Sequence, residues 1–181
     1  MIRDAFGAGV EPGGLHSHRE IKMLVCYMLA NIPEPLTRES IFTVLCGHGM
    51  ANFFDISAVI DDLLSLHNLQ EDELGRLTVT QVGRDAAITL QDMLPLTLRE
   101  RSVAAAKRLI VRLQNERENH VDIRREEHGC TVTCTVGDQG TPLMTLSLLV
   151  GNEKQAEDIR ERFLNDPLSI YRAVIDSVAK N

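Results

Sequence analysis

The stretch that decides the fold of the first half is "NFFDISAVIDDLLSLHNLQEDELGRLTVTQVGRDA", residues 52–86. Its first part has apolar residues at helical spacing, which predicts a helix with one buried face. These are Ile56, Val59, Ile60, Leu63 and Leu64. Asn52 has a side chain suited to capping the start of that helix. The part that follows, with a turn at Gly75, predicts a two-stranded antiparallel hairpin, and Thr80 is suited to capping a further helix.

Three other segments of the first half also show helical spacing. They are residues 17–32, 38–47 and 81–94. Ser17 and Glu20 fit a capping box at the start of the first segment, and Thr37 is a suitable cap for the second. Over residues 1–95 the predicted order is therefore helix, helix, helix, strand, strand, helix. This is the order of a winged helix-turn-helix domain, in which the third helix enters the major groove of DNA.

The second half, residues 96–181, predicts a separate small α+β domain. A long helix with many basic residues spans about 97–119, and three strand-like runs follow at 121–128, 130–136 and 142–150. The short connections between these runs favour a three-stranded antiparallel sheet. Two helices close the chain, the last one starting after Asp166. Its predicted buried face consists of Leu168, Tyr171, Val174, Ile175 and Val178.

The third of these strands is apolar on both faces. Met144, Leu146, Leu148 and Val150 lie on one face, and Leu143 and Leu149 lie on the other. A strand buried on both sides needs cover from helices or from a second subunit. The sequence therefore predicts a dimerisation or sensing domain, and we expect a homodimer. A pocket for an effector between sheet and helices is an alternative use of the same domain.

Charge is distributed unevenly along the chain. Residues 1–95 contain 6 Lys and Arg against 13 Asp and Glu, a net charge of −7, whereas residues 96–181 contain 13 of each. Affinity for nucleic acid comes from cations that neutralise phosphates, so the first half begins with a deficit. No apolar run is long enough to span a membrane, and the amino terminus does not resemble a secretory signal. We therefore expect a cytoplasmic protein whose four cysteines are free thiols.

The run "LTVTQVGRDAA", residues 77–87, resembles the end of the wing in many winged helix-turn-helix regulators. The whole chain also resembles an uncharacterised bacterial family of winged-helix proteins, catalogued as a domain of unknown function. The resemblance lies in "MIRDAF", "REIKMLVCYML", "NFFDISAVIDDLL", "LTVTQVGRDA" and "PLSIYRAVIDSV". It implies a transcriptional regulator that binds double-stranded DNA, and it brings no established ligand or catalytic residues.

Four residues are the candidate DNA contacts by their position in such a domain. Asn52 and Ser57 would face bases, and Arg38 and Arg76 would contact the phosphate backbone. Acidic residues of the same elements oppose this interpretation. They are Asp55, Asp61 and Asp62 on the helix, and Glu71, Asp72 and Glu73 at the wing. The alternative hypothesis is a winged-helix module that presents an acidic surface to a protein partner and does not bind DNA directly.

Catalysis and metal binding find little support in the sequence. There is no glycine-rich phosphate loop, no G-x-S-x-G motif and no acid pair beside a plausible base. His16, His18, Cys46 and His48 have short spacings, but no second paired motif of standard zinc spacing follows. We therefore predict a protein that is not an enzyme and that has no metal site and no cofactor.

Overall fold

The computed structural model describes residues 10–138 and 140–179, so the segment "MIRDAF" lies outside the described residues. Over these residues the chain is an α+β protein with seven α-helices and two three-stranded antiparallel sheets. Its contacts divide it into two compact units, Met1–Leu109 (unit 1) and Ile110–Asn181 (unit 2). The boundary falls inside helix α5, Leu96–Glu118.

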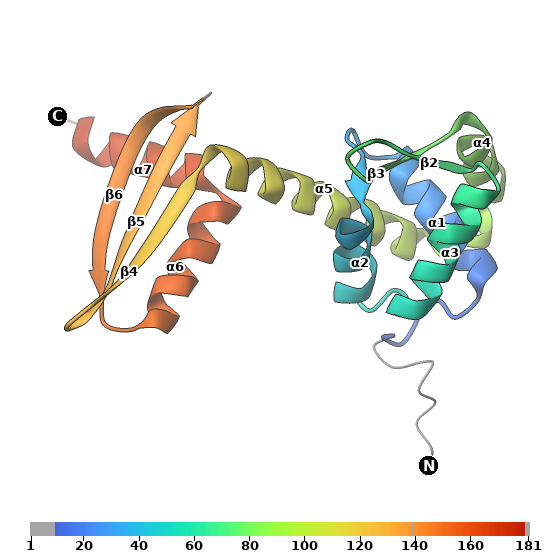
Figure 1. The fold of residues 1–181 in the computed structure, drawn as a ribbon, viewed down its shortest axis with the longest axis horizontal. Helices are drawn as coiled ribbons and strands as arrows, with labels where there is room; N and C mark the ends of the chain where they lie inside the picture. The colour runs from blue at the N-terminus through green and yellow to red at the C-terminus, as the bar shows by residue number, and fades with distance from the viewer. Residues whose placement is uncertain (1–9, 139, 180–181) are drawn as a thin grey trace, which may run out of the picture. The chain divides into compact units, whose positions relative to one another are not determined.

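Unit 1 places a small sheet beside a group of helices (Figure 1). The elements are α1 (His18–Ala30), β1 (Leu36–Thr37), α2 (Arg38–Gly47), α3 (Phe53–Ser65), β2 (Leu69–Glu71), β3 (Arg76–Val79), α4 (Gln81–Leu90) and the 3-10 turn η2 (Gln91–Met93). The three helices and the hairpin predicted for residues 17–79 are confirmed. Strand β1 was not predicted, because two residues are too short to show a strand pattern. It pairs with β3, so the sheet order is β1-β3-β2 with both pairs antiparallel.

Side-chain caps fix the starts of most helices in unit 1. Thr37 accepts a hydrogen bond from the Ser40 backbone N–H at 3.1 Å, and Thr80 accepts one from the Gly83 N–H at 3.2 Å. Ser17 occupies the cap position of α1, but its side chain makes no cap hydrogen bond, so the predicted capping box is wrong. Helix α1 packs against both α3 and α4, and its inward residues are almost completely buried.

Glycine is required where α4 meets the start of β2. A Cβ atom on Gly83 would overlap the carbonyl oxygen of Asn68 and crowd the side chain of Val79. The Thr80 hydroxyl donates to the carbonyl oxygens of His67 and Asn68 at 2.7 and 3.1 Å. These hydrogen bonds also hold the start of α4 against the residues that precede β2. The absence of a side chain at Gly83 therefore allows α4 to lie this close to the start of β2.

The first turns of α5 belong to unit 1. Leu98, Ser102 and Ala106 are buried, and the Arg101 guanidinium donates to the carbonyl oxygen of His48 at 3.1 Å. The sequence pattern predicts a domain boundary before this helix, between residues 95 and 96. The contacts of the chain divide it 14 residues later, between Leu109 and Ile110.

Unit 2 is a three-stranded antiparallel sheet in the order β4-β5-β6, as predicted. Its strands are β4 (His120–Glu126), β5 (Gly129–Asp138) and β6 (Thr141–Val150), and its helices after α5 are α6 (Glu153–Asn165) and α7 (Pro167–Ala179). Both helices lie on one face of the sheet (Figure 1). The core on that face contains Cys130, Val132, Cys134, Val136, Ala156, Phe163 and Leu164. The four cysteines of the protein are free thiols.

Two predictions about burial in unit 2 are wrong for the single chain. Strand β6 is not covered on both sides: it is an edge strand, and Leu143, Leu148 and Leu149 are exposed. The predicted buried face of α7 is also largely open, because Leu168, Ile175 and Val178 are exposed. The reason lies in the size of the unit, since a three-stranded sheet is covered mainly by α6 and leaves α7 little surface to pack on.

Candidate nucleic-acid interface

Helix α3 presents the surface that the sequence analysis assigned to DNA. Its buried face consists of Ile56, Val59, Ile60 and Leu63. The opposite face is open to solvent and includes Phe54, Ala58, Asp61 and Asp62. Periodicity alone therefore decides which side of α3 faces outward, and that side is the predicted one.

The two predicted base contacts differ in their environment. Asn52 is buried, and its Oδ1 accepts a hydrogen bond from the Asp55 backbone N–H at 2.9 Å. Its side-chain amide also donates to the Asp55 carboxylate, so Asn52 serves as the cap of α3. Ser57 lies one turn further along the helix and is partly buried.

The two predicted phosphate contacts are both engaged with carboxylates of unit 1. Arg38 Nη1 lies 2.6 Å from Asp61 Oδ1, and its Nε lies 3.9 Å from Glu71 Oε1. Arg76 Nε lies 2.7 Å from Asp72 Oδ2 at the turn between β2 and β3. Asp72 also accepts from the backbone N–H of Arg76, and these contacts hold the pKa of its carboxyl below the usual range.

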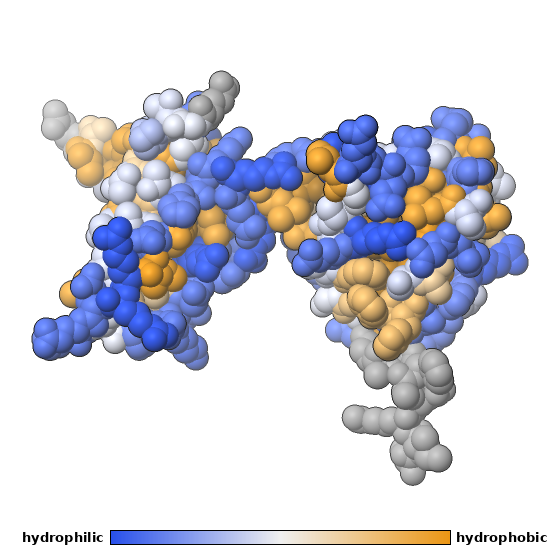
Figure 2. Space-filling view, viewed as in Figure 1, coloured by the Kyte–Doolittle hydropathy of each residue, from blue (hydrophilic) through white to orange (hydrophobic). Residues whose placement is uncertain are grey.

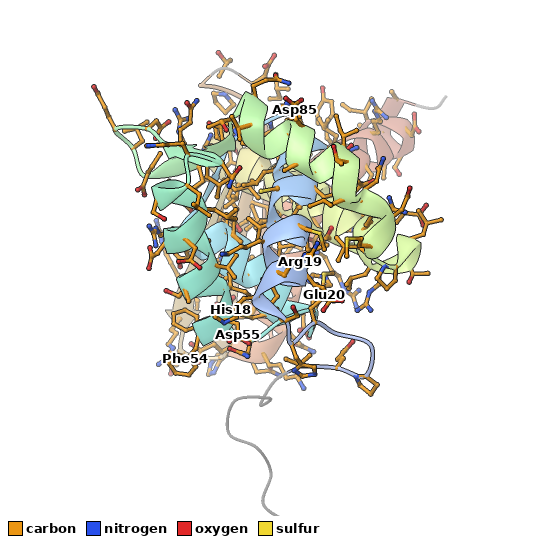
Figure 3. The ribbon with its side chains drawn as sticks, turned by 90° about the vertical axis from the view of Figure 1, so that its right-hand side faces the viewer. His18, Arg19, Glu20, Phe54, Asp55 and Asp85 are labelled. Carbon is orange, nitrogen blue, oxygen red and sulfur yellow. The ribbon has the colours of Figure 1, made fainter. Side chains whose placement is uncertain are left out.

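Each aspartate of α3 has a basic side chain of a neighbouring helix as its partner. His18 Nε2 lies 3.1 Å from Asp55, Lys22 Nζ lies 2.9 Å from Asp62, and Arg38 contacts Asp61 as described. The hydrogen bond from Lys22 lowers the pKa of the Asp62 carboxyl. Figure 3 shows His18 of α1 facing Asp55 at the start of α3. Two of these aspartates, Asp62 and Asp61, are therefore paired with the cations Lys22 of α1 and Arg38 of α2.

The partners His18 and Lys22 were not identified from the sequence as part of this surface. Their spacing of four residues places them on one side of α1. Which helix that side faces depends on the packing of α1 against α3, and no local pattern reports it. The pairing of α1 side chains with α3 aspartates is thus visible only in the folded unit.

Three phenylalanines gather at the start of α3. The rings of Phe42 and Phe53 have centroids 4.4 Å apart, and Phe53 meets Phe54 edge to face at 5.8 Å. Phe54 is 74% exposed, and Figure 3 places it beside Asp55, at the end of the unit away from Asp85. Figure 2 shows apolar side chains gathered at the lower end of unit 1. We call Phe42, Phe53 and Phe54 the aromatic cluster.

Two of the histidines weighed as metal ligands have other contacts. His18 pairs with Asp55, and a ring nitrogen of His48 lies 3.0 Å from the Val44 carbonyl oxygen. Within residues 10–138 and 140–179, no group of three or more His, Cys, Asp or Glu side chains is arranged to hold a metal ion.

The chain is thus an α+β protein of two units. Unit 1 has a face rich in acidic residues, formed by α3 and the β2–β3 hairpin, and unit 2 is built around a second sheet. The chain belongs to the family described as a domain of unknown function (DUF4364), whose model matches residues 21–178. The comparison with curated proteins and the comparison with solved structures each found no match. None of the helices in the described part of the chain is long and apolar enough to cross a membrane.

Proposed function

We propose that unit 1 is a winged helix-turn-helix domain and that the protein is a DNA-binding transcriptional regulator of the cytoplasm. The observation that carries this proposal is topological. Helices α2 and α3 precede a hairpin whose strand β3 also pairs with β1, in the sheet order β1-β3-β2. One face of α3 is open to solvent, and Arg38 contacts both Asp61 of α3 and Glu71 of β2, which links this helix to the hairpin. A helix and a hairpin that are linked in this way can contact a groove and its adjacent phosphates together.

In this proposal α3 enters the major groove and the turn at residues 72–75 lies along the backbone. Arg38 and Arg76 supply phosphate contacts, and Ser57 faces the bases. Asn52 contributes by fixing the first turn of α3, since its side chain is already used as the cap. No catalytic step is assigned to any residue.

The ion pairs of α3 determine how strong such binding is. Arg38 and Arg76 must leave Asp61 and Asp72 to reach phosphates, and each exposed carboxylate left behind repels the DNA. One copy of unit 1 therefore binds weakly and loses affinity steeply as salt rises. Two copies on one duplex double the contacts, which fits a dimeric regulator.

Direct titration tests the proposal. The purified protein is titrated with random-sequence duplexes and with duplexes from upstream of its own gene, across a salt series from low to physiological ionic strength. We expect binding with a negative salt slope, and loss of binding for Arg38→Gln. Asp61→Asn removes a like charge and releases Arg38, so we expect it to raise affinity by about fivefold, equivalent to roughly 1 kcal/mol.

The control is Asp85→Asn, which removes one negative charge from α4. Asp85 lies at the other end of the unit from Phe54 and Asp55 (Figure 3), so its loss should change affinity far less than Asp61→Asn. Equal effects of the two substitutions would show that only net charge matters and that α3 is not the contact. Absence of binding at low salt, with Asp61→Asn included, would contradict the proposal.

A second candidate function is supported by the aromatic cluster. Exposed aromatic side chains are enriched in protein–protein interfaces, and here they adjoin an acidic helix that suits a basic protein partner. In this case Phe54→Ser abolishes capture of the partner, whereas Arg38→Gln leaves it intact. The DNA proposal predicts the greater loss of DNA binding for Arg38→Gln, so the two variants separate the candidates.

A further inference from the structure

The two edges of the unit 2 sheet differ in charge. Strand β4 carries Asp122, Arg124, Arg125 and Glu126, and Arg125 is held by Glu153 of α6 at 2.7 Å. Strand β6, "TPLMTLSLLV", has ten residues and not one charged side chain. Charged residues on an edge strand discourage pairing with another chain, and a long uncharged apolar edge favours it. The free edge of β6 is therefore the one suited to a further strand.

The helix-covered face of β6 is incompletely covered. Leu148 lies opposite Val132, and Leu146 lies opposite Cys134, so both point to the same side as the buried core. Yet neither belongs to the residues that pack against that core, and Leu148 is 38% exposed. A shallow groove runs between the end of β6 and α6, lined by Leu149, Val150 and Ile159 among others.

Helix α7 has exposed apolar side chains that could cover this open face of β6. Among its described residues only Pro167 is buried, and Val178 is 81% exposed. Figure 1 shows α7 crossing the helix side of the sheet, with its last turns protruding past β6 near the end where that strand begins. The uncovered Leu148 lies toward the other end of the same strand.

We propose that unit 2 forms a dimer in which β6 pairs antiparallel with β6 of a second copy, giving one continuous six-stranded sheet. A twofold axis at the middle of β6 exchanges the two ends of the strand. It brings Leu148 of the second copy next to the end where α7 protrudes, so that each α7 covers the open face of the other β6. One twofold contact thus covers both exposed surfaces, the open face of β6 and the apolar side of α7.

The proposed contact has about as many hydrogen bonds as a typical protein interface. Pairing two ten-residue edges forms on the order of ten backbone hydrogen bonds, and a typical protein interface has about ten. Burial of Leu146, Leu148, Ile175 and Val178 from both copies adds an apolar centre. No charge on β6 opposes the pairing, and the two charged residues of α7, Arg172 and Asp176, have opposite signs. This inference does not depend on what unit 1 binds.

The test is the mass of the full-length chain in solution, measured by light scattering over a concentration series. We expect the wild type to have twice the mass of one chain. Leu148→Lys and Val178→Glu should each weaken the dimer by at least tenfold, with an unchanged circular dichroism spectrum. Val111→Glu is the matched control, because Val111 is also an exposed apolar residue of unit 2 but lies on α5; it should remain a dimer.

The double variant Leu148→Lys with Val178→Glu gives the sharper result. If α7 covers the second copy's β6, the two new charges are opposite and adjacent, and dimerisation should recover relative to either single variant. Hydrogen exchange should also show backbone amides of β6 that are protected in the wild type and exposed in Val178→Glu. A monomeric wild type, dimers unaffected by both substitutions, or the absence of recovery in the double variant would overturn the proposal.

Discussion

At the scale of single residues, Gly83 contributes more to the stability of unit 1 than its position in a helix suggests. Alanine is favoured over glycine within helices by up to about 1 kcal/mol, so propensity alone predicts that Gly83→Ala stabilises the protein. The structure predicts the opposite sign, because the new Cβ would overlap the Asn68 carbonyl oxygen. We expect unit 1 to lose about 1–3 kcal/mol of unfolding free energy, measured by urea denaturation.

Gly47, the last residue of α2, provides the comparison. No atom lies within 4 Å of the position that a Cβ would take there, so Gly47→Ala should be neutral or slightly stabilising. If both substitutions changed stability in the same direction and by similar amounts, close packing at Gly83 would not be the cause.

At the scale of elements, one ion pair links α6 to the last turns of α5. Arg112 donates to both carboxylate oxygens of Glu161 at 2.7 and 2.8 Å, and also to Glu116 at 3.0 Å. The hydrogen bonds from Arg112 lower the pKa of the Glu161 carboxyl. Next to this pair, the Asn115 amide donates to the Leu164 carbonyl oxygen at 3.0 Å. These contacts hold α6 against the last turns of α5.

The lowered pKa of Glu161 gives a pH-dependent prediction. A carboxyl with a depressed pKa in the folded state stabilises the fold at neutral pH, and this contribution is lost as pH falls through that pKa. Glu161→Gln should therefore cost unit 2 about 0.5–1 kcal/mol at pH 7, a modest figure because the pair is half exposed to solvent. Thermal unfolding followed from pH 7 down to pH 3 should show the wild type and the variant converging.

Glu157→Gln serves as the reference for that experiment. Glu157 pairs with Arg160 on the same helix at 3.6 Å, so it does not connect two elements. Its loss should have a smaller effect at pH 7. A difference between wild type and Glu161→Gln that persisted unchanged at acidic pH would assign the effect to packing rather than to charge.

At the scale of the whole molecule, the division inside α5 has a testable consequence. A fragment ending at residue 95 lacks Leu98, Ser102 and Ala106, which are buried in unit 1, and also Arg99, whose guanidinium lies over the Tyr27 ring at 5.5 Å. Residues 1–109 should therefore unfold at a higher temperature than residues 1–95 in differential scanning calorimetry. Equal unfolding temperatures would place the boundary before α5, where the sequence pattern placed it.

Sequence patterns predicted where the helices and strands lie better than they predicted which faces of these elements are buried. Apolar spacing located α1, α2, α3 and the hairpin, because burial of one helix face leaves a direct mark on the sequence. The same spacing on α7 predicted a buried face, but spacing shows only that a face is apolar. Whether another element covers it depends on the size of the sheet and on any second chain.

The candidate interface shows the same limit. The sequence predicted the outward face of α3 and its acidic character from Asp55, Asp61 and Asp62. It could not predict that Lys22 and Arg38 neutralise Asp62 and Asp61, since these pairs join segments 40 and 23 residues apart. Long-range pairing of charges follows from helix packing and has no local signal.

The uncharged strand β6 also bears on the synthesis of the protein. The ribosome completes β6 before α6 and α7, the helices that lie on one of its faces. During that interval an apolar edge and an apolar face are both open, and such strands are the segments that aggregate from partly folded chains. Slower or cooler expression should therefore increase the soluble yield, and nascent chains that end shortly after Val150 should depend most on chaperones.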